Sequence, residues 1–344
     1  MPMKTVLVTG AAGYIGSTIV RHLLHRGHTV WGLDLLLYGD SGAREFTPNP
    51  HYKLFKGDIR DPATYETLLG QVDAVIHLAA IVGMPVCSKY PDLANEVNWL
   101  STKALFDCAS RTGTVKRFLF ASSTSVYGAG QDHGFVNEES PTNPLSLYAE
   151  LKLKCEDYMR HASARSGFVP TVLRFPTAYG LSGRMRFDLT VNEFTRDLAL
   201  GAEVKIFGEG CWRPYCHVDD LAQACVRVLE ASEVLVDHEV YCVGDTNENY
   251  TKQMLCEILR EIIPGGKMTH VQHGDDPRDY RVDCSKIQRI GFCVTKTVRD
   301  GVQEIFRALR QGLIPNPYDP MYTSTVIPGP SNPSACAWMS NVTP

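Results

Sequence analysis

The stretch Lys4-Thr-Val-Leu-Val-Thr-Gly10-Ala-Ala-Gly13-Tyr-Ile-Gly16 decides how the N-terminal half of this chain folds. A short β-rich run precedes the glycines, and apolar residues at helical spacing follow them as far as Gly27. A second β-rich run at 29–33 ends on Asp34. The order strand, glycine-rich turn, helix, strand and acid is typical of a βαβ unit that binds a dinucleotide.

Each glycine has a separate role in such a unit. Gly10 permits the tight turn, Gly13 lets the backbone approach a pyrophosphate, and Gly16 lets the helix pack on the sheet. The first turn of the helix then faces the phosphates. Tyr14 and Ile15 lie in this turn and are therefore also predicted to bind the cofactor.

Asp34 bears on the choice of cofactor. A carboxylate at this place accepts hydrogen bonds from the adenosine ribose hydroxyls and repels a 2′-phosphate. The sequence therefore favours NAD over NADP.

The N-terminal half continues as alternating strands and helices. Strands are predicted near 52–58, 74–78, 117–121 and 169–173, with long helices at 92–110 and 146–163. This alternation predicts an α/β protein with a Rossmann-type, doubly wound parallel sheet. The strand at 74–78 runs into small residues that let a cofactor lie against the backbone, at Leu78, Ala79 and Ala80.

A chemical apparatus follows the strand at 117–121. Four hydroxyl residues come where this strand ends, at 122–125, and Tyr148 and Lys152 are four apart on a predicted helix. An ammonium beside a phenol favours the phenolate and moves its pKa toward the working pH. A hydroxyl from the strand end can hold a substrate oxygen, so this stretch predicts removal of a proton from an alcohol.

The Tyr-x-x-x-Lys pattern also occurs by chance. A second match at Tyr52 and Lys56 lies in a predicted strand, where the two side chains would be about 13 Å apart. We give it no function, and we predict that His77 is a structural residue at a strand end.

Composition excludes several classes of function. The net charge is −4, without a basic run, which argues against a nucleic-acid or anionic-membrane surface. The 11 cysteines lack Cys-x-x-Cys spacing, so neither a metal site nor a disulfide framework is predicted. The chain enters a strand by Lys4 and has no long apolar run, so a soluble cytoplasmic protein is expected.

The helix–strand pattern loosens after residue 180, which indicates a second lobe. We predict a cofactor-binding domain at 1–176 to which 211–236 return, and a smaller substrate-binding lobe at 177–210 and 237–312. The proline-rich tail at 313–344 is expected to be extended, or ordered only by a partner.

Together these motifs resemble the extended short-chain dehydrogenases/reductases, in the NAD-dependent nucleotide-sugar epimerase/dehydratase family, over residues 4–310. The resemblance implies that a sugar nucleotide lies between the two parts of the chain. It also implies a homodimer formed by the helices at 92–110 and 146–163, with Phe106, Leu151 and Met159 on or near the contact faces. Further cofactor-binding residues are implied by it: Asp58, Ile59, Asn98 and Phe175.

The hydroxyl residues Ser123, Thr124 and Ser125 indicate the type of reaction. Sugar 4,6-dehydratases have Thr-Asp-Glu here, and their acidic pair eliminates water. This chain lacks that pair and most resembles 4-epimerases of hexoses and uronic acids. It departs from the usual pattern at Thr177, where galactose epimerases have Asn, and at Pro214, where the family usually has Asp.

The resemblance implies a mechanism through a 4-keto sugar. Tyr148 takes the proton of the 4-OH, NAD takes the C4 hydride, and the sugar turns before the hydride returns to its other face. Lys152 lowers the phenol pKa and binds the nicotinamide ribose. Ser123 bonds the reacting oxygen, and Thr124 or Ser125 positions the sugar. Substrate-binding candidates are Thr177, Arg184, Arg186, Asn192, Arg213 and Arg278, although Arg184 and Arg186 are equally compatible with solvated loop residues.

Two other functions remain open at this point. A nucleotide-sugar 4-ketoreductase would require external NAD(P)H and would release oxidised cofactor. An NAD-sensing binding protein could keep the glycines and lose the catalytic pair, whereas this chain keeps both Tyr148 and Lys152.

Overall fold

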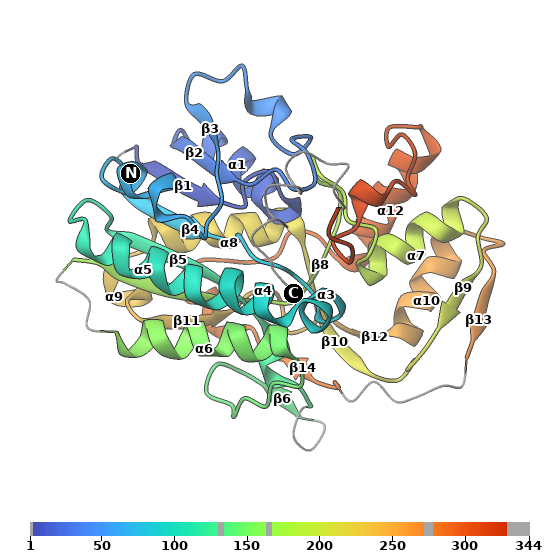
Figure 1. Ribbon diagram of the computed structural model, residues 1–344. Coiled ribbons are helices and arrows are strands. Elements are labelled where there is room, and N and C mark those ends of the chain that lie inside the picture. The colour runs from blue at the N-terminus through green and yellow to red at the C-terminus, as the bar shows by residue number, and fades with distance from the viewer. Residues whose placement is uncertain (1–2, 130–133, 163–166, 272–277, 329–344) are drawn as a thin grey trace.

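A computed structural model describes residues 3–129, 134–162, 167–271 and 278–328. Its largest feature is a sheet of seven parallel strands (Figure 1). In spatial order these strands are β3 (Tyr52–Lys56), β2 (Thr29–Asp34), β1 (Thr5–Thr9), β4 (Ala74–His77), β5 (Arg117–Ser123), β7 (Val169–Phe175) and β11 (Glu239–Cys242). The order reverses between β1 and β4, and ligands of such sheets bind beyond the carboxyl ends of the strands at this reversal.

Helices cover both faces of the sheet. In β1, Val6 and Val8 face a core shared with α1 (Tyr14–His25) and α8 (Val218–Glu230), while Leu7 faces the opposite core. That second core is covered by α5 (Ser101–Arg111) and α6 (Leu147–His161), which run side by side in Figure 1. The near-continuous apolar runs of the strands follow from this burial on both faces.

The helix predicted at 92–110 is interrupted. It consists of α4 (Pro91–Asn95), a π-helical turn at Glu96–Leu100, and α5. Asn98 lies in the π turn and bonds both backbone groups of Ile81, with Nδ2 and Oδ1 each 2.8 Å from its partner. The turn therefore holds the loop that follows β4.

The second lobe has its own apolar core, seen to the right in Figure 1. Three helices enclose this core: α7 (Thr190–Ala199), α10 (Lys252–Ile262) and α12 (Val298–Arg310). Two small sheets complete the lobe: β8 (Thr177–Tyr179) with β10 (Trp212–His217) and β12 (Asn249–Thr251), and β9 (Val204–Ile206) with β13 (Met268–His270).

Short elements make the remaining connections. The helices among them are α2 (Glu66–Leu69), α3 (Met84–Lys89), α9 (Glu233–Val236) and α11 (Ser285–Gln288), and the strands are β6 (Phe135–Val136) and β14 (Arg281–Val282). Single 3₁₀ turns occur at Arg44–Phe46, Pro62–Thr64, Thr124–Tyr127 and Pro320–Tyr322. Among the residues described, no helix combines the length and apolarity needed to cross a membrane.

The sheet pairing divides the chain differently from the predicted domain boundaries. β11 is an edge strand of the large sheet, although 237–312 was assigned to the substrate lobe. β10 pairs with β8 and β12, whereas all of 211–236 was expected to return to the cofactor domain. Only the later part of this range does so: α8 packs against α1, and α9 lies against β7 and β11. The physical reason is that the chain crosses between the two parts inside short strands, which composition does not reveal.

Candidate active site

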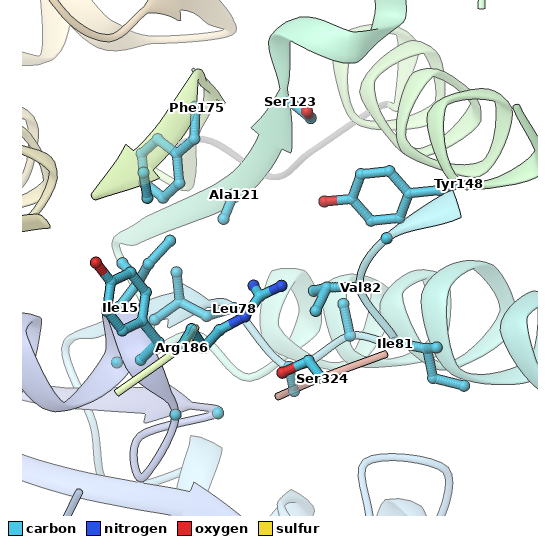
Figure 2. Close-up of a pocket in the computed structure, with 18 of the residues that line it drawn as sticks. Ile15, Leu78, Ile81, Val82, Ala121, Ser123, Tyr148, Phe175, Arg186 and Ser324 are labelled. Carbon is cyan, nitrogen blue, oxygen red and sulfur yellow. The ribbon is translucent and has the colours of Figure 1, made fainter. Parts of the chain in front are cut away.

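The described residues enclose a cavity of about 450 Å³ beyond the carboxyl ends of β1, β2, β4, β5 and β7 (Figure 2). This volume is in the range of small-molecule sites. Most of the predicted site residues line it: Gly10, Gly13, Tyr14, Ile15, Gly16, Asp34, Asp58, Ile59, Leu78, Ala79, Ala80, Ser123, Thr124, Ser125, Tyr148, Lys152, Phe175, Thr177, Arg184, Arg186, Arg213 and Arg278.

The glycine turn forms one end of the cavity. Gly10 has φ +71°, which favours glycine, and a Cβ added to Gly16 would lie 2.0 Å from the Gly10 carbonyl oxygen. Gly13 is the N-cap of α1 and has no side chain with which to cap the helix. The free N–H groups of its first turn therefore remain available for an anionic ligand.

Asp34 ends β2 and is held by the backbone. Its Oδ2 accepts from Ala12 N at 3.0 Å and its Oδ1 from Leu36 N at 2.8 Å. Burial raises the pKa of Asp34, and these two hydrogen bonds and the charge of Arg184 oppose the increase. A carboxylate oxygen has a second lone pair, so Asp34 can still accept a hydrogen bond from a ligand.

Tyr148 and Lys152 reach the cavity from the first turns of α6. Ser146 caps this helix by accepting from Ala149 N at 3.3 Å. Lys152 Nζ donates to the Ala121 carbonyl at 2.6 Å and lies 5.8 Å from the centre of the Tyr148 ring. In Figure 2 the Tyr148 hydroxyl points into the space that Ser123, Ala121 and Arg186 surround.

The electrostatics of this pair differ from the sequence expectation. Burial raises the pKa of Tyr148 to about 12, and the effects that oppose it are the charge of Arg186 and a hydrogen bond with Ser123. Burial also lowers the pKa of Lys152 to about 8. The net shift of the phenol pKa is therefore upward and not downward as expected, because desolvation of the phenolate is its largest cause. That Lys152 lowers this pKa stays a prediction.

The three hydroxyls at the end of β5 have different surroundings. Ser123 Oγ accepts from Ser125 N at 3.1 Å, and Thr124 Oγ1 lies 3.3 Å from the Tyr280 hydroxyl. Ser125 Oγ is buried and has no hydrogen-bond partner among the described residues. A buried hydroxyl without a partner is costly, so Ser125 is a good candidate for contact with a ligand.

The four predicted arginines lie at different parts of the cavity. Arg186 pairs with Asp188 at 2.6 Å and points toward the centre (Figure 2). Arg213 and Arg278 line the side of the second lobe together with Tyr280. Arg184 contacts the Tyr38 ring at 4.0 Å and the C-terminal segment, and its charge acts on Asp34. It therefore lies on the cofactor side of the cavity and not at the predicted substrate side.

Two predicted ligand-binding residues do not line the cavity. The Asn98 side chain bonds the backbone of Ile81, as described above. Asn192 is fully buried, and it donates to Tyr14 Oη at 3.1 Å and accepts from Gly180 N at 3.0 Å. Both amides satisfy buried backbone and hydroxyl groups instead of a ligand. These two assignments are corrected, since residue type could not show which way the side chains point.

The fold agrees with two predictions that a residue or motif has no catalytic role. Tyr52 and Lys56 are in strand β3, and His77 is buried between the hydroxyls of Thr9 and Thr102 at 2.7 and 2.8 Å. Burial lowers the pKa of His77 to about 3, so this ring is neutral.

Sequence reasoning missed several residues that line the cavity. Among them are Leu37, Tyr38, Gly39, the loop at 81–84, Ser324 and Ile327. The loop follows directly from β4 and could have been included from its position, whereas Ser324 and Ile327 are about 290 residues from the Asp34 end of the site and carry no motif. Among the described residues, no group of three or more His, Cys, Asp or Glu side chains is arranged to hold a metal ion.

Comparison with known proteins decides the family. The sequence model of the NAD dependent epimerase/dehydratase family matches residues 6–244. The chain belongs to this family. Within it, a probable UDP-glucuronate 4-epimerase of Rhizobium meliloti (strain 1021) is 26% identical over 324 residues, covering 86% of this chain and 94% of the relative.

Solved structures of family members have the same fold. A UDP-glucose 4-epimerase of Thermus thermophilus, in complex with NAD, is 28% identical with a TM-score of 0.75, covering 89% of this chain and 99% of that one. The UDP-glucuronic acid 4-epimerase of Bacillus cereus, in complex with UDP-glucuronic acid and NAD, is 25% identical with a TM-score of 0.76 and the same coverage. The predicted fold class and family are thus confirmed.

Proposed function

We propose that this protein interconverts the C4 epimers of a UDP-sugar with NAD as its cofactor. The observation that carries the proposal is the cavity in which the glycine turn, Asp34, Tyr148 and the hydroxyls of β5 meet. Its relatives support UDP as the nucleotide, because the epimerases described above are named for UDP-sugars.

The cavity fits a dinucleotide at its glycine end. The uncapped N–H groups of α1 suit a diphosphate, and the Asp34 carboxylate suits a ribose diol. When bound, NAD supplies the hydride acceptor and a positively charged ring.

The residues of the chain move and hold the proton. Tyr148 takes the proton of the sugar 4-OH and later returns it. Ser123, which already bonds the Tyr148 side chain, holds the reacting oxygen. Lys152 uses one of its three donors on the Ala121 carbonyl and keeps the others for the ribose of the cofactor. The raised pKa of Tyr148 implies that nearby positive charge is needed to form the phenolate.

The far end of the cavity is suited to the sugar nucleotide. Arg213 and Arg278 line it and can bind a diphosphate, and Thr177 and Ser125 offer hydroxyls to the sugar. Thr124 and Ser125 cannot act as the acid and base that loss of water requires, so the site supports epimerisation and not dehydration.

Incubation with UDP-glucose, UDP-galactose and their uronic acid counterparts, followed by proton NMR, tests this function. Interconversion of a gluco/galacto pair without added NADH is expected. Turnover that requires added NAD(P)H and releases oxidised cofactor would identify a ketoreductase. NAD binding without turnover of any sugar in the panel would identify a binding protein.

Asp34 is expected to determine the preference for NAD. Its carboxylate repels a 2′-phosphate, so calorimetry should show NAD binding at least about tenfold tighter than NADP, and Asp34→Ala should narrow that gap. Because Asp34 also accepts from Ala12 and Leu36, NAD itself should bind more weakly to the variant. Equal affinities of the wild type for both cofactors would contradict the role given to Asp34.

A homodimer through α5, α6 and the π turn remains our proposal, with different contact residues. Phe106, Leu151 and Met159 are buried in the core of the single chain, so they cannot form the contact face predicted for them. The apolar side chain that is available there is Leu100, which is 50% exposed and follows Trp99. Lys154 of α6 lies 4.4 Å from the Trp99 ring, so α6 and the π turn meet at this surface.

Leu100→Glu should shift the dimer to monomer, because a dimer would bury the new charge without a partner. Light scattering at micromolar concentration measures the mass. Val234→Glu is the matched control, since Val234 is 90% exposed on α9 and should leave the dimer unchanged. A monomeric wild type would contradict the proposal.

We also propose a cytoplasmic location. The ten cysteines that the structure describes are all free thiols, and most of them are buried. Free thiols persist in a reducing compartment, whereas an oxidising one favours disulfides. Fractionation of the source cells would test this location.

A further inference from the structure

The segment at 320–328 lies along the cavity, far in sequence from the rest of the site. Between the 3₁₀ turn Pro320–Tyr322 and residue 328 the chain has no regular structure, yet Ser324 and Ile327 are only 4% and 6% exposed and both line the cavity. Their neighbour Val326 is 57% exposed. Figure 2 shows Ser324 across the cavity from Ala121, Ser123 and Phe175.

Arg184 fastens this segment to the body of the protein. Its Nη1 donates to Ser324 Oγ at 3.0 Å, and its Nη2 donates to the carbonyls of Thr323 at 2.9 Å and Met321 at 3.3 Å. The guanidinium stacks on Tyr38 at 4.0 Å. A further hydrogen bond joins the segment to the backbone after Arg184, from Phe187 N to the Tyr322 carbonyl at 2.7 Å.

These contacts are at the Asp34 end of the cavity. Tyr38 follows Asp34 in the loop after β2, and the charge of Arg184 acts on both. Ile327 packs in the same apolar cluster as Ile59 and Ile81, which line the cavity beyond the ends of β3 and β4. The segment is thus one wall of the place where Asp34 would hold the adenosine ribose.

Arg184 has a buried donor without a partner at this wall. Its Nε is buried and has no hydrogen-bond partner among the described residues, while the side chain as a whole is 4% exposed. A buried guanidinium N–H without an acceptor is costly. The ADP part of a dinucleotide offers several oxygen acceptors, which would satisfy it.

We propose that Ser324 and Ile327 belong to the NAD site, on a strap (residues 321–327) that closes over the ADP half of the cofactor and is held there by Arg184. In this role Ile327 covers the apolar side of the adenosine pocket, and Arg184 Nε donates to an oxygen of the ADP moiety. The tail is then a cofactor-binding element of the same chain. Bound NAD can leave only after the strap has detached from Arg184.

Two truncations test the strap. Removal of residues 323–344 takes away Ser324 and Ile327 but keeps Tyr322, which packs on Phe187, and removal of 329–344 is the control that leaves the strap whole. Calorimetry with ADP-ribose should show a loss of at least about tenfold for the longer truncation and a change within about twofold for the control. UDP affinity should be unchanged in both, because the strap is at the other end of the cavity.

Adjacent point variants make the same test without shortening the chain. Ile327→Asp should weaken ADP-ribose binding by at least about tenfold and speed NAD release, while Val326→Asp, at an exposed position, should do neither. Arg184→Met should behave like Ile327→Asp. Circular dichroism melting of each variant identifies any that fail to fold.

The outcomes are distinct. Unchanged ADP-ribose affinity in both Ile327→Asp and the 323–344 truncation would overturn the strap. Tighter binding after truncation would also overturn it, because the segment would then block the site. The proposal rests on NAD binding and not on the epimerase reaction, so a protein that binds NAD but converts no sugar leaves this test intact.

Discussion

Tyr148→Phe should lower turnover by at least about a hundredfold while it changes NAD affinity by less than about tenfold, because general-base help is typically worth 10²–10⁴-fold in rate. The substitution keeps the ring and its packing in α6 and removes only the ionisable oxygen. The glycine turn and Asp34, which we propose hold the cofactor, are untouched. Epimer interconversion followed by NMR gives the rate, and calorimetry gives the NAD affinity.

The pH dependence of the wild-type rate is a second test of the role of Tyr148. Because burial raises the pKa of Tyr148 to about 12, the phenol is mostly protonated near neutral pH and the phenolate fraction increases as the pH rises. The rate should therefore increase with pH through the neutral range. Arg186→Gln removes a charge that lowers this pKa and should move the profile to higher pH, whereas Arg186→Lys should retain it.

Two neighbouring variants are matched to Tyr148→Phe. Ser123→Ala should lower the rate less, because a hydrogen bond to a charged group is worth about 1.5–3 kcal/mol. Lys152→Met should reduce both turnover and NAD affinity, since we assign Lys152 to the cofactor ribose. A Tyr148→Phe enzyme that works at near wild-type speed would show that the proton goes elsewhere.

Arg174→Met should lower the free energy of unfolding by about 3–5 kcal/mol, the usual cost of leaving a buried charge unpaired. Arg174 and Glu156 are 3% and 0% exposed, and their Nη2 and Oε2 atoms are 2.7 Å apart. Arg174 Nη1 also donates to the Tyr127 hydroxyl at 2.8 Å, and Ser122 donates to Glu156. The pair ties β5, β7 and α6 together beneath the residues that we propose are catalytic.

Urea denaturation measures the loss, and two controls separate its causes. Arg299→Met breaks the exposed pair with Glu261, so it should cost no more than about 1 kcal/mol. The double variant Arg174→Met with Glu156→Leu removes both buried charges and should recover much of the stability. A loss below about 1 kcal/mol in Arg174→Met would contradict our account of this pair.

Local patterns of the sequence were sufficient for the elements that hold most of the site. The spacing of apolar residues around Gly10–Gly16 predicts the first βαβ unit, and the four-residue interval places Tyr148 and Lys152 on one face of α6. The position of the hydroxyl residues at the end of β5 follows for the same reason. In an α/β sheet, strand ends and helix starts are set by neighbours in sequence, and the ligand site lies where these ends meet.

Only the tertiary structure decided what depends on residues far apart in the chain. Asn98 and Asn192 have the chemistry of ligand contacts, but the packing turns them toward buried backbone. The pKa of Tyr148 is raised because distant segments exclude water from it, which spacing on one helix cannot show. Ile327 reaches the cavity by the same kind of long-range contact, since nothing in a proline-rich tail indicates which surface its apolar residues will cover.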